Sequence, residues 1–566
     1  MMKHRLPRPG LFFAAVALLL AAWLGGAWWW EIIHNNNRLI GGVLLRSQDM
    51  PALLLGIGAL LLLSPFAGGG GQGQAGAWSR DPRLVAALLL GATLFCWTMS
   101  HFWFAGYALS RDEEVAQFAA AYLREGMIAR PIPAEWIAYR RAIMPEFFSP
   151  FGADRYWAAA YLPVNSAIRA CFSALGDAAL TGPALMLAGL IALWRIALRL
   201  FPQRPDAVAV ALLMALVSPQ LLVTAMTPYA MTAHFALNLV WLALVLKDRR
   251  WSHAAAGVVV LLLAGVHQWH FPLIFLAPFL LWFALQRRWR VLAFHAATMA
   301  LAVILWAKLW PAFLQDMLGA PADVLPAAGV GHKIGSLIDR LDKWHPLLHL
   351  SRFLAWNNLL LVPLALVAIV RMDWRKALRG ETPVLPLALG CVGASLLAID
   401  QGYGWGYRYL HGYIGPLALL AGYGWVALGW KSLRPIWLSL LIVLLTGSFL
   451  AQRARDQVLP YAKAHQLIHA STADVVLVDP RGGRFVTDLV RGQDGNPLGP
   501  PVVMNLAMLT QDRLDRLCDR YPIEIFDQTH FLPLGVPPVA WRSAHIAALR
   551  AQMLERGCGR LMAAPR

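Results

Sequence analysis

The chain carries few charged residues for its length. Asp, Glu, Lys and Arg make up 14% of its 566 residues, while hydrophobic residues make up 58%. Soluble domains have about 25% charged residues. A disordered chain needs low hydrophobicity and high net charge, so this composition excludes one. A soluble enzyme would lack the polar side chains to cover such a surface. We therefore predict a polytopic α-helical membrane protein.

Cysteine is also scarce, with five residues and no CxxC pair. This excludes a small disulfide scaffold and gives no cysteine pattern for a metal. Cys518 and Cys558 lie in the polar C-terminal segment. They can pair if that segment lies outside the cytosol, and two free thiols are the alternative.

Several catalytic motifs are absent from the sequence. There is no GxxxxGK[ST] motif, and the predicted inside connections are too short for a nucleotide-binding domain, which argues against an ATP-driven pump. No GxSxG, HExxH or EF-hand pattern supports a hydrolase, a metalloprotease or a calcium site.

Apolar runs long enough for membrane spans recur along the chain. A span needs about 20 mostly apolar residues. We predict about thirteen spans, some of them short enough to be re-entrant. They lie near 11–30, 50–65, 84–109, 178–198, 207–224, 229–246, 254–266, 269–285, 291–310, 353–370, 382–399, 409–429 and 435–450.

Lys and Arg are distributed unevenly between the connections. With the N-terminus inside, the inside connections carry 20 Lys and Arg, and the outside ones other than 110–170 and 451–566 carry 7, in segments of similar total length. This is the bias expected of cytoplasmic loops. Much of the net charge of +18 is then a topology signal, and no nucleic-acid partner is indicated. Residues 110–170, 311–352 and 451–566 are predicted to face outward.

We expect three regions. Residues 1–83 form a two-helix hairpin with a Gly-rich linker, 84–450 the transmembrane catalytic domain, and 451–566 a small α/β domain. Within the last region, 475–478 and 523–526 have strand-like patterns, and 511–520 and 543–556 have helical spacing. The turn at 479–483 could cradle an anion, although a plain turn is the favoured interpretation.

The strongest local signal is Arg111-Asp112-Glu113-Glu114, directly after the third predicted span. Carboxylates near the membrane surface are costly to hold there, so they suggest a function. A partly desolvated carboxylate is more basic and could take a proton from an acceptor hydroxyl. We assign Asp112 and Glu113 as catalytic candidates. The alternative is that the acids merely open a helix and favour its dipole.

The segment 110–170 that follows is rich in aromatic residues and is broken at Pro131, Pro133, Pro145 and Pro150. It reads as short amphipathic helices along the outer membrane interface. Such helices could roof a cavity and stack aromatic rings on sugars, or they could only anchor the chain at the interface. Glu146 and Asp154 in this segment are further substrate-binding candidates.

A second motif covers residues 400–413, with Gly, Tyr and Trp around Arg408. A guanidinium binds phosphate through two parallel hydrogen bonds and stays charged, so Arg408 is a candidate for the donor phosphate. The alternative partner is a phospholipid headgroup. Lys333 and His332 are weaker phosphate candidates. The aromatic residues beside Arg408 are candidates for substrate binding, namely Trp405, Tyr407 and Tyr409.

These motifs resemble those of the membrane glycosyltransferases of the GT-C fold. Asp112-Glu113 resembles the Asp-Glu pair of the protein O-mannosyltransferases. The layout of 84–450 is similar to that of the bacterial aminoarabinose transferases that modify lipid A. The stretch Gly406-Tyr-Arg408-Tyr-Leu resembles their Arg-containing outer-loop motif, and Pro416 follows in the next span. The acidic motif follows the third span instead of the first, which fits if 11–65 is an addition.

The resemblance implies a sugar transfer from a polyprenyl-phosphate donor to a glycan, lipid or protein acceptor. The lipid tail would stay among the spans, the phosphate would meet Arg408, and Asp112 would act as general base in one inverting displacement. The expected location is a bacterial inner membrane, with the site and the C-terminal domain in the periplasm and membrane lipids as further partners. The sequence indicates no cofactor and leaves open whether a divalent cation assists.

Three other functions remain open from the sequence. A flippase for a lipid-linked sugar would place ionisable residues in mid-span, where few occur here. A lipid-linked glycan polymerase or ligase would need two or more outer arginines, which 110–170 could supply. A structural envelope protein would need none of these carboxylates.

Overall fold

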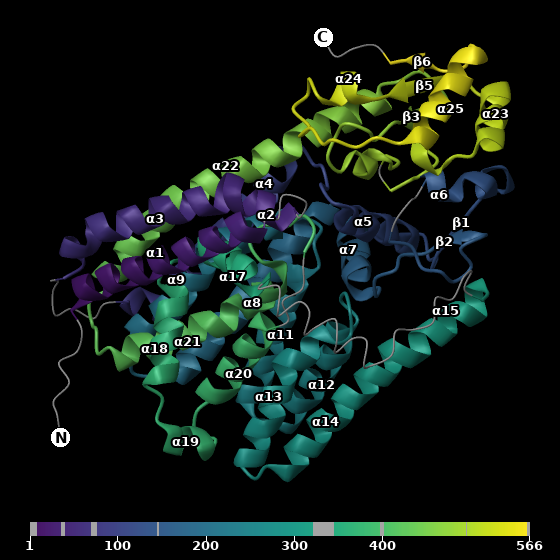
Figure 1. Cartoon of the computed structure of the whole chain (residues 1–566). Helices are drawn as coiled ribbons and strands as arrows, with labels where there is room; N and C mark the ends of the chain where they lie inside the picture. Colours follow the sequence, from purple (N-terminus) through teal and green to yellow (C-terminus); the bar gives the residue numbers. More distant parts are fainter. Residues whose placement is uncertain are drawn as a thin grey trace. The chain divides into compact units, whose positions relative to one another are not determined.

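The computed structural model describes residues 8–34, 40–68, 76–143, 147–320, 345–396, 401–493 and 495–562. Its contacts divide the chain into two compact units (Figure 1). Unit 1 comprises Met1–Thr98, Gly182–Lys308 and Ala327–Arg453. Unit 2 comprises Met99–Thr181, Leu309–Pro326 and Ala454–Arg566. Met99–Thr181 thus belong to the same unit as the C-terminal residues. The sequence instead predicts most of them within the transmembrane region 84–450.

Unit 1 is built from apolar helices. Its helices begin with α1 (Pro9–His34), α2 (Ile40–Leu44), the π-helix η1 (Leu45–Asp49), α3 (Met50–Leu63) and α4 (Pro82–Phe102). They continue with α8 (Thr181–Leu200), α9 (Pro205–Leu216), α10 (Pro219–Ala225), α11 (Met231–Lys247), α12 (Arg250–Ala264), α13 (Phe271–Leu285) and α14 (Trp289–Ile304). The last are α17 (His345–Ala355), α18 (Leu361–Val370), α19 (Trp374–Leu378), α20 (Val384–Ser395), the 3-10 helix η7 (Arg408–Tyr413), α21 (Ile414–Ala427) and the start of α22 (Arg434–His469).

The long apolar helices identify a membrane protein. Within the described residues, six helical segments are long and apolar enough to cross a membrane, among them α1, α4 and α8. The pair α9 and α10 passes the same test together and is bent by 51°. Five shorter apolar helices, including α11, α12 and α13, accompany them. Helices thus form at the predicted apolar runs, and the number of thirteen crossings stays a prediction.

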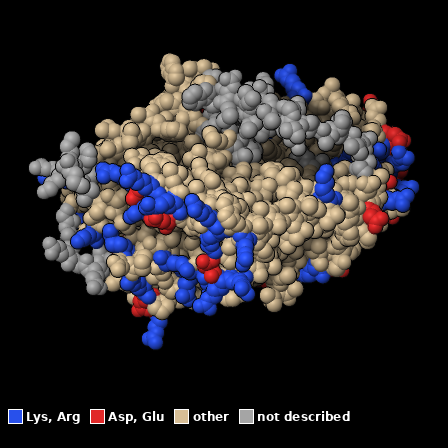
Figure 2. Space-filling model, turned by 90° about the horizontal axis from the view of Figure 1, so that it is seen from below, with Lys and Arg blue, Asp and Glu red and all other residues tan. Residues whose placement is uncertain are grey.

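Basic side chains gather on one part of the surface. Figure 2 shows Lys and Arg grouped over one region of the face turned to the viewer, with fewer Asp and Glu among them. In the chain, the short helix α19 connects α18 and α20 and carries Arg375 and Lys376. The orientation of the chain in the membrane remains a prediction.

A buried ion pair joins the N-terminal helices to the rest of unit 1. Arg352 of α17 donates from Nε to Asp49 Oδ2 at 2.9 Å, and both side chains are fully buried. Trp356 Nε1 donates to Asp49 Oδ1 at 2.7 Å, and Arg352 Nη2 donates to the carbonyl of Gly404 at 2.7 Å. The described N-terminal helices α1, α2 and α3, which the sequence sets apart by a Gly-rich linker, therefore pack against α17 in unit 1.

Unit 2 combines short helices with two small sheets. It contains α5 (Arg111–Arg124), β1 (Arg130–Pro131), η4 (Ala134–Tyr139), α6 (Arg140–Ile143), β2 (Tyr156–Trp157), α7 (Val164–Ala174) and α15 (Trp310–Leu318). Its C-terminal part contains β3 (Val475–Val478), β4 (Val502–Asn505), α23 (Gln511–Arg520), β5 (Ile523–Phe526), α24 (Gln528–Phe531), α25 (Ala544–Glu555) and β6 (Arg560–Leu561). The described C-terminal strands pair in the order β4-β3-β5-β6, all parallel. The strands β3 and β5 lie where the sequence predicts them.

The aromatic residues of the outer segment belong to the core of this unit. Phe118, Tyr122, Trp136 and Trp157 are buried in one cluster with apolar residues of β3, β4 and β5. Trp136 also stacks on Tyr521, with ring centroids 5.3 Å apart. Neither role expected from the sequence, membrane anchoring or sugar stacking, describes these four rings. Their burial instead stabilises a shared fold of the outer segment and the C-terminal strands.

Cys518 and Cys558 form a disulfide within unit 2. This resolves the alternatives left by the sequence in favour of the pair. Disulfides form and persist mainly in oxidising compartments. The bond is therefore consistent with unit 2 lying outside the cytosol.

Candidate functional site

The acidic motif opens helix α5 through a capping box. Ser110 is the N-cap, and its side chain and that of Glu113 are bonded reciprocally to each other's backbone N–H groups. Glu113 Oε2 accepts from the backbone N–H of Ser110 at 2.9 Å and from its hydroxyl at 3.0 Å. Glu113 is 2% exposed. The local interpretation, acids that start a helix, is thus confirmed for Glu113.

Arg111 and Glu114 form a second buried group at the same helix end. Arg111 Nη1 lies 3.1 Å from Glu114 Oε2, and the guanidinium also donates to the carbonyls of Val490 (2.9 Å) and Thr487 (2.8 Å). Burial disfavours the charged guanidinium, but Glu114 and Asp488 outweigh it and hold the pKa of Arg111 above its ordinary value. This pair therefore joins α5 to the C-terminal residues of unit 2.

Asp112 differs from the two acids that follow it because its side chain is half-buried and not fully buried. The hydroxyl of Tyr161 donates a hydrogen bond to Asp112 Oδ1. The residue is therefore partly exposed, while Tyr161 fixes the orientation of its carboxylate. Among the three acids, Asp112 has the exposure that a general base for an incoming hydroxyl requires.

A buried cation lies close to the capping box. Arg169 of α7 is 4% exposed and donates from Nη1 to the carbonyl of Ala178 at 3.0 Å. Burial lowers the pKa of Arg169 to about 10, while the Glu113 and Asp177 carboxylates oppose that shift. Its positive charge therefore compensates part of the negative charge at the start of α5.

Removing the capping side chain should weaken α5 without touching Asp112. Replacing Ser110 by Ala deletes the hydroxyl that accepts from the N–H of Glu113. We expect a loss of about 0.5–2 kcal/mol in unfolding free energy, the usual range for an N-cap. Thermal unfolding of the detergent-purified chain measures it. The Ser110→Thr variant keeps a capping hydroxyl and should lose less, and equal losses in both variants would contradict the capping role.

Arg408 opens the 3-10 helix η7 in unit 1 and is 8% exposed. Its backbone N–H donates to Gln401 Oε1 at 2.6 Å. Its guanidinium lies 5.0 Å from the centre of the Tyr229 ring, within the range of a cation–π contact. These contacts place a permanent positive charge in a largely buried position.

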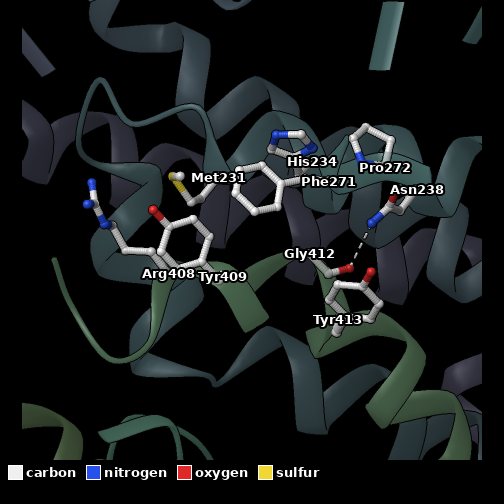
Figure 3. Close-up of a pocket in the computed structure, with 9 residues that line it drawn as sticks. All are labelled: Met231, His234, Asn238, Phe271, Pro272, Arg408, Tyr409, Gly412 and Tyr413. Atoms are coloured by element: carbon white, nitrogen blue, oxygen red, sulfur yellow. Dashed lines mark hydrogen bonds between the residues drawn. The ribbon is translucent and has the colours of Figure 1, made fainter. Parts of the chain in front are cut away.

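Arg408 also lines a small pocket (Figure 3). Figure 3 shows Arg408 and Tyr409 together at one side of it, and His234 and Asn238 on the other. Asn238 Nδ2 donates to the carbonyl of Gly412 at 3.2 Å. The cavity volume is about 30 Å³, room for about two water molecules. A sugar phosphate would therefore bind here only after the pocket opens.

The aromatic residues around Arg408 have different surroundings. Trp405 is 3% exposed and Tyr407 is 1% exposed, with the Tyr407 ring stacked on that of His349 at 4.6 Å. Neither ring presents an open face to a ligand in this structure. Tyr409, in contrast, lines the pocket and lies 5.0 Å from the ring of Phe271. Of the three predicted substrate-binding aromatics, Tyr409 is the one placed beside a cavity.

Of the four remaining predicted site residues, the structure describes one. Glu146, His332 and Lys333 lie outside the described residues. Asp154 is exposed, and its carboxylate lies 3.9 Å from Arg155 Nε. Sequence reasoning missed Tyr161, Arg169 and Tyr229, since no short spacing connects them to the residues they contact.

Fold and site together define a helical membrane protein whose acidic helix start belongs to a unit with a parallel α/β sheet. No family model and no curated protein sequence matches the chain. Among solved structures, it is similar to ArnT from Cupriavidus metallidurans bound to undecaprenyl phosphate, with 14% identity, a TM-score of 0.43, and 74% of this chain and 89% of that chain covered. For ArnT in the apo state the values are 15%, 0.40, 86% and 90%.

Proposed function

We propose that the chain is a membrane glycosyltransferase. It would move a sugar from a polyprenyl-phosphate donor to an extracytoplasmic glycan, lipid or protein by a single inverting displacement. The observation that carries the proposal is the state of Asp112. This carboxylate is half-buried, oriented by Tyr161, and next to a capping acid that is fully buried.

Asp112 is the general base in this proposal. The acceptor hydroxyl oxygen attacks the anomeric carbon while its proton passes to Asp112. The bond between that carbon and the phosphate oxygen breaks, and its electron pair leaves with polyprenyl phosphate. Tyr161 orients the carboxylate that receives this proton. Glu113 is a positioning residue, because its carboxylate is held by Ser110.

Arg408 is assigned to the donor phosphate from its own surroundings. It is largely buried and lines a pocket among apolar helices, where a polyprenyl tail can remain in hydrocarbon. A guanidinium keeps its charge there and matches the geometry of phosphate oxygens. It would also stabilise the negative charge that develops on the departing phosphate.

Two independent features support a periplasmic location for unit 2. Unit 2 contains both Asp112 and the Cys518–Cys558 disulfide, which favours an oxidising environment. The charge bias of the connections predicts the same side of the membrane for residues 110–170 and 451–566. The proposed acceptors are therefore those of the cell envelope, on the periplasmic side of an inner membrane.

Replacing Arg408 should weaken binding of the polyprenyl-phosphate donor. We expect Arg408→Gln to weaken donor binding by about tenfold to a hundredfold, since a hydrogen bond between charged groups contributes about 1.5–3 kcal/mol. The apparent KM for a polyprenyl-phosphate sugar measures this effect. Arg408→Lys keeps the charge and should lose less. The exposed Arg379→Gln serves as the control, and an Arg408→Gln enzyme with unchanged KM would remove Arg408 from the donor site.

The proposal is tested with the purified chain and a radiolabelled polyprenyl-phosphate sugar in proteoliposomes. Transfer of label to any envelope acceptor, or its slow hydrolysis to free sugar, supports the glycosyltransferase. Movement of the intact donor across the bilayer without bond cleavage would point to the flippase. Growth of a lipid-diphosphate-linked glycan would point to the polymerase or ligase.

A further inference from the structure

We propose that the C-terminal α/β fold of unit 2 holds a second binding site, specific for an anionic saccharide, meaning a sugar that carries phosphate or carboxylate. The site is a cavity of about 700 Å³. None of the residues assigned above to sugar transfer lines it. The proposal therefore does not depend on the transferase function.

The topology of the sheet places this cavity where α/β folds bind ligands. The chain runs from β3 to β4 on one side and then returns to add β5 and β6 on the other. The order of connection therefore reverses between β3 and β5. Ligands of open parallel sheets bind outside the carboxyl ends of the strands at such a switch point. Asp479 and Asp527, the residues directly after β3 and β5, both line the cavity.

The cavity has an excess of positive charge. Its lining contains three arginines, Arg481, Arg542 and Arg550, against the two aspartates. Each aspartate is already paired: Arg481 Nη2 lies 2.6 Å from Asp479 Oδ2, and Arg550 Nη2 lies 3.2 Å from Asp527 Oδ2. Arg542 adds a charge that neither carboxylate balances. An anion is therefore the ligand that the site favours.

Arg550 offers a donor to such an anion. Its Nη1 atom is buried and has no hydrogen-bond partner in the part of the chain that the structure describes. A buried donor without an acceptor costs about 1–3 kcal/mol, more when charged. Because the Arg550 side chain is partly exposed (24%), a small turn of the guanidinium would bring this donor to a phosphate or carboxylate oxygen in the cavity.

The remaining lining suits a sugar. Trp541 lines the cavity and is 43% exposed, so its ring is available for the apolar face of a pyranose. The turn after β3 passes close to Gln528 at Gly482, where an added Cβ would lie 2.5 Å from Gln528 Oε1. Gly482 also has φ +86°, a conformation that glycine adopts most easily. The volume lies within the usual range of small-molecule sites. The Cys518–Cys558 disulfide of the same unit favours envelope saccharides over cytosolic nucleotides.

Binding of defined probes to the detergent-purified full chain tests the site. Equilibrium dialysis would compare glucose 6-phosphate, glucuronate, glucose, inorganic phosphate and AMP. We expect glucose 6-phosphate and glucuronate to bind, inorganic phosphate to bind more weakly, and glucose not to bind. Binding of none of the anionic sugars, or equal binding of glucose, would overturn the proposal. Tighter binding of AMP would overturn the saccharide class.

Variants of the lining arginines test whether glucose 6-phosphate binds in this cavity. Arg550→Gln and the exposed Arg542→Gln should each weaken glucose 6-phosphate binding by about tenfold or more. Arg556→Gln is the matched control, since Arg556 follows on the same chain segment but pairs with Asp515 and Asp519 outside the cavity. Arg550→Gln also removes the contact with Asp527. If Arg550→Gln unfolds for that reason, Arg542→Gln is the variant that tests the site. Equal affinity in Arg542→Gln and Arg556→Gln would overturn the assignment.

Discussion

Exchange of Asp112 for Asn should lower the rate of sugar transfer by about 10²–10⁴, the range for loss of a general base. Asn keeps the size of the side chain and can still meet the Tyr161 hydroxyl, but it cannot accept the proton of the acceptor. The effect should fall on kcat and leave donor binding nearly unchanged. Initial rates with a labelled polyprenyl-phosphate sugar, at saturating donor, measure it.

Two further variants separate chemistry from folding. Asp512→Asn changes an exposed acid of α23 in the same unit and should leave the rate unchanged. Glu113→Gln weakens the capping box, so it should lower the unfolding temperature and reduce the rate less than Asp112→Asn does. An Asp112→Asn protein with near wild-type turnover would refute the base. Glu113 would take its place if Glu113→Gln alone abolished turnover in a folded protein.

Loss of one partner from the Asp49–Arg352 pair should be the most destabilising single change in unit 1. Both side chains are 0% exposed, and Asp49 also accepts from Trp356. Asp49→Ala would leave a buried guanidinium without its carboxylate. The expected cost is about 3–5 kcal/mol of unfolding free energy. Denaturant-induced unfolding in detergent micelles, followed by circular dichroism, measures it.

The double variant Asp49→Leu, Arg352→Met supplies the comparison. Removing both charges together leaves no uncompensated ion, and similar buried pairs can be replaced by apolar residues with little loss. We expect it to be more stable than Asp49→Ala, although the bond from Arg352 to Gly404 is lost. A single variant as stable as the wild type would show that the pair is not needed to hold the N-terminal helices.

The elements of the fold could be predicted because their signals are local. Apolar runs such as Pro9–His34 and Pro82–Phe102 form helices wherever about twenty such residues follow one another. The strands β3 and β5 stand out as short apolar, β-branched runs in a polar region. The helix start at Ser110 is equally local, because a cap and its acid are three residues apart.

Contacts between distant segments could not be predicted in this way. Asp49 and Arg352 are 303 positions apart, and nothing in either neighbourhood indicates the other. Trp136 looked like an interfacial residue because its segment is aromatic and follows a span, yet it packs against the C-terminal strands. The same limit applies to Tyr161 and Asp112, whose contact depends on the packing of unit 2.

The central claim, that the chemistry takes place on the extracytoplasmic side, can be tested on a native side chain. Cys171 of α7 is exposed and lies in unit 2 with Asp112, whereas Cys96 and Cys391 are buried and Cys518 is bonded to Cys558. A membrane-impermeant maleimide should label intact spheroplasts of cells producing the protein, and Cys171→Ser should abolish that labelling. Labelling of Cys171 only after the membrane is broken would place Asp112 in the cytosol and contradict the account.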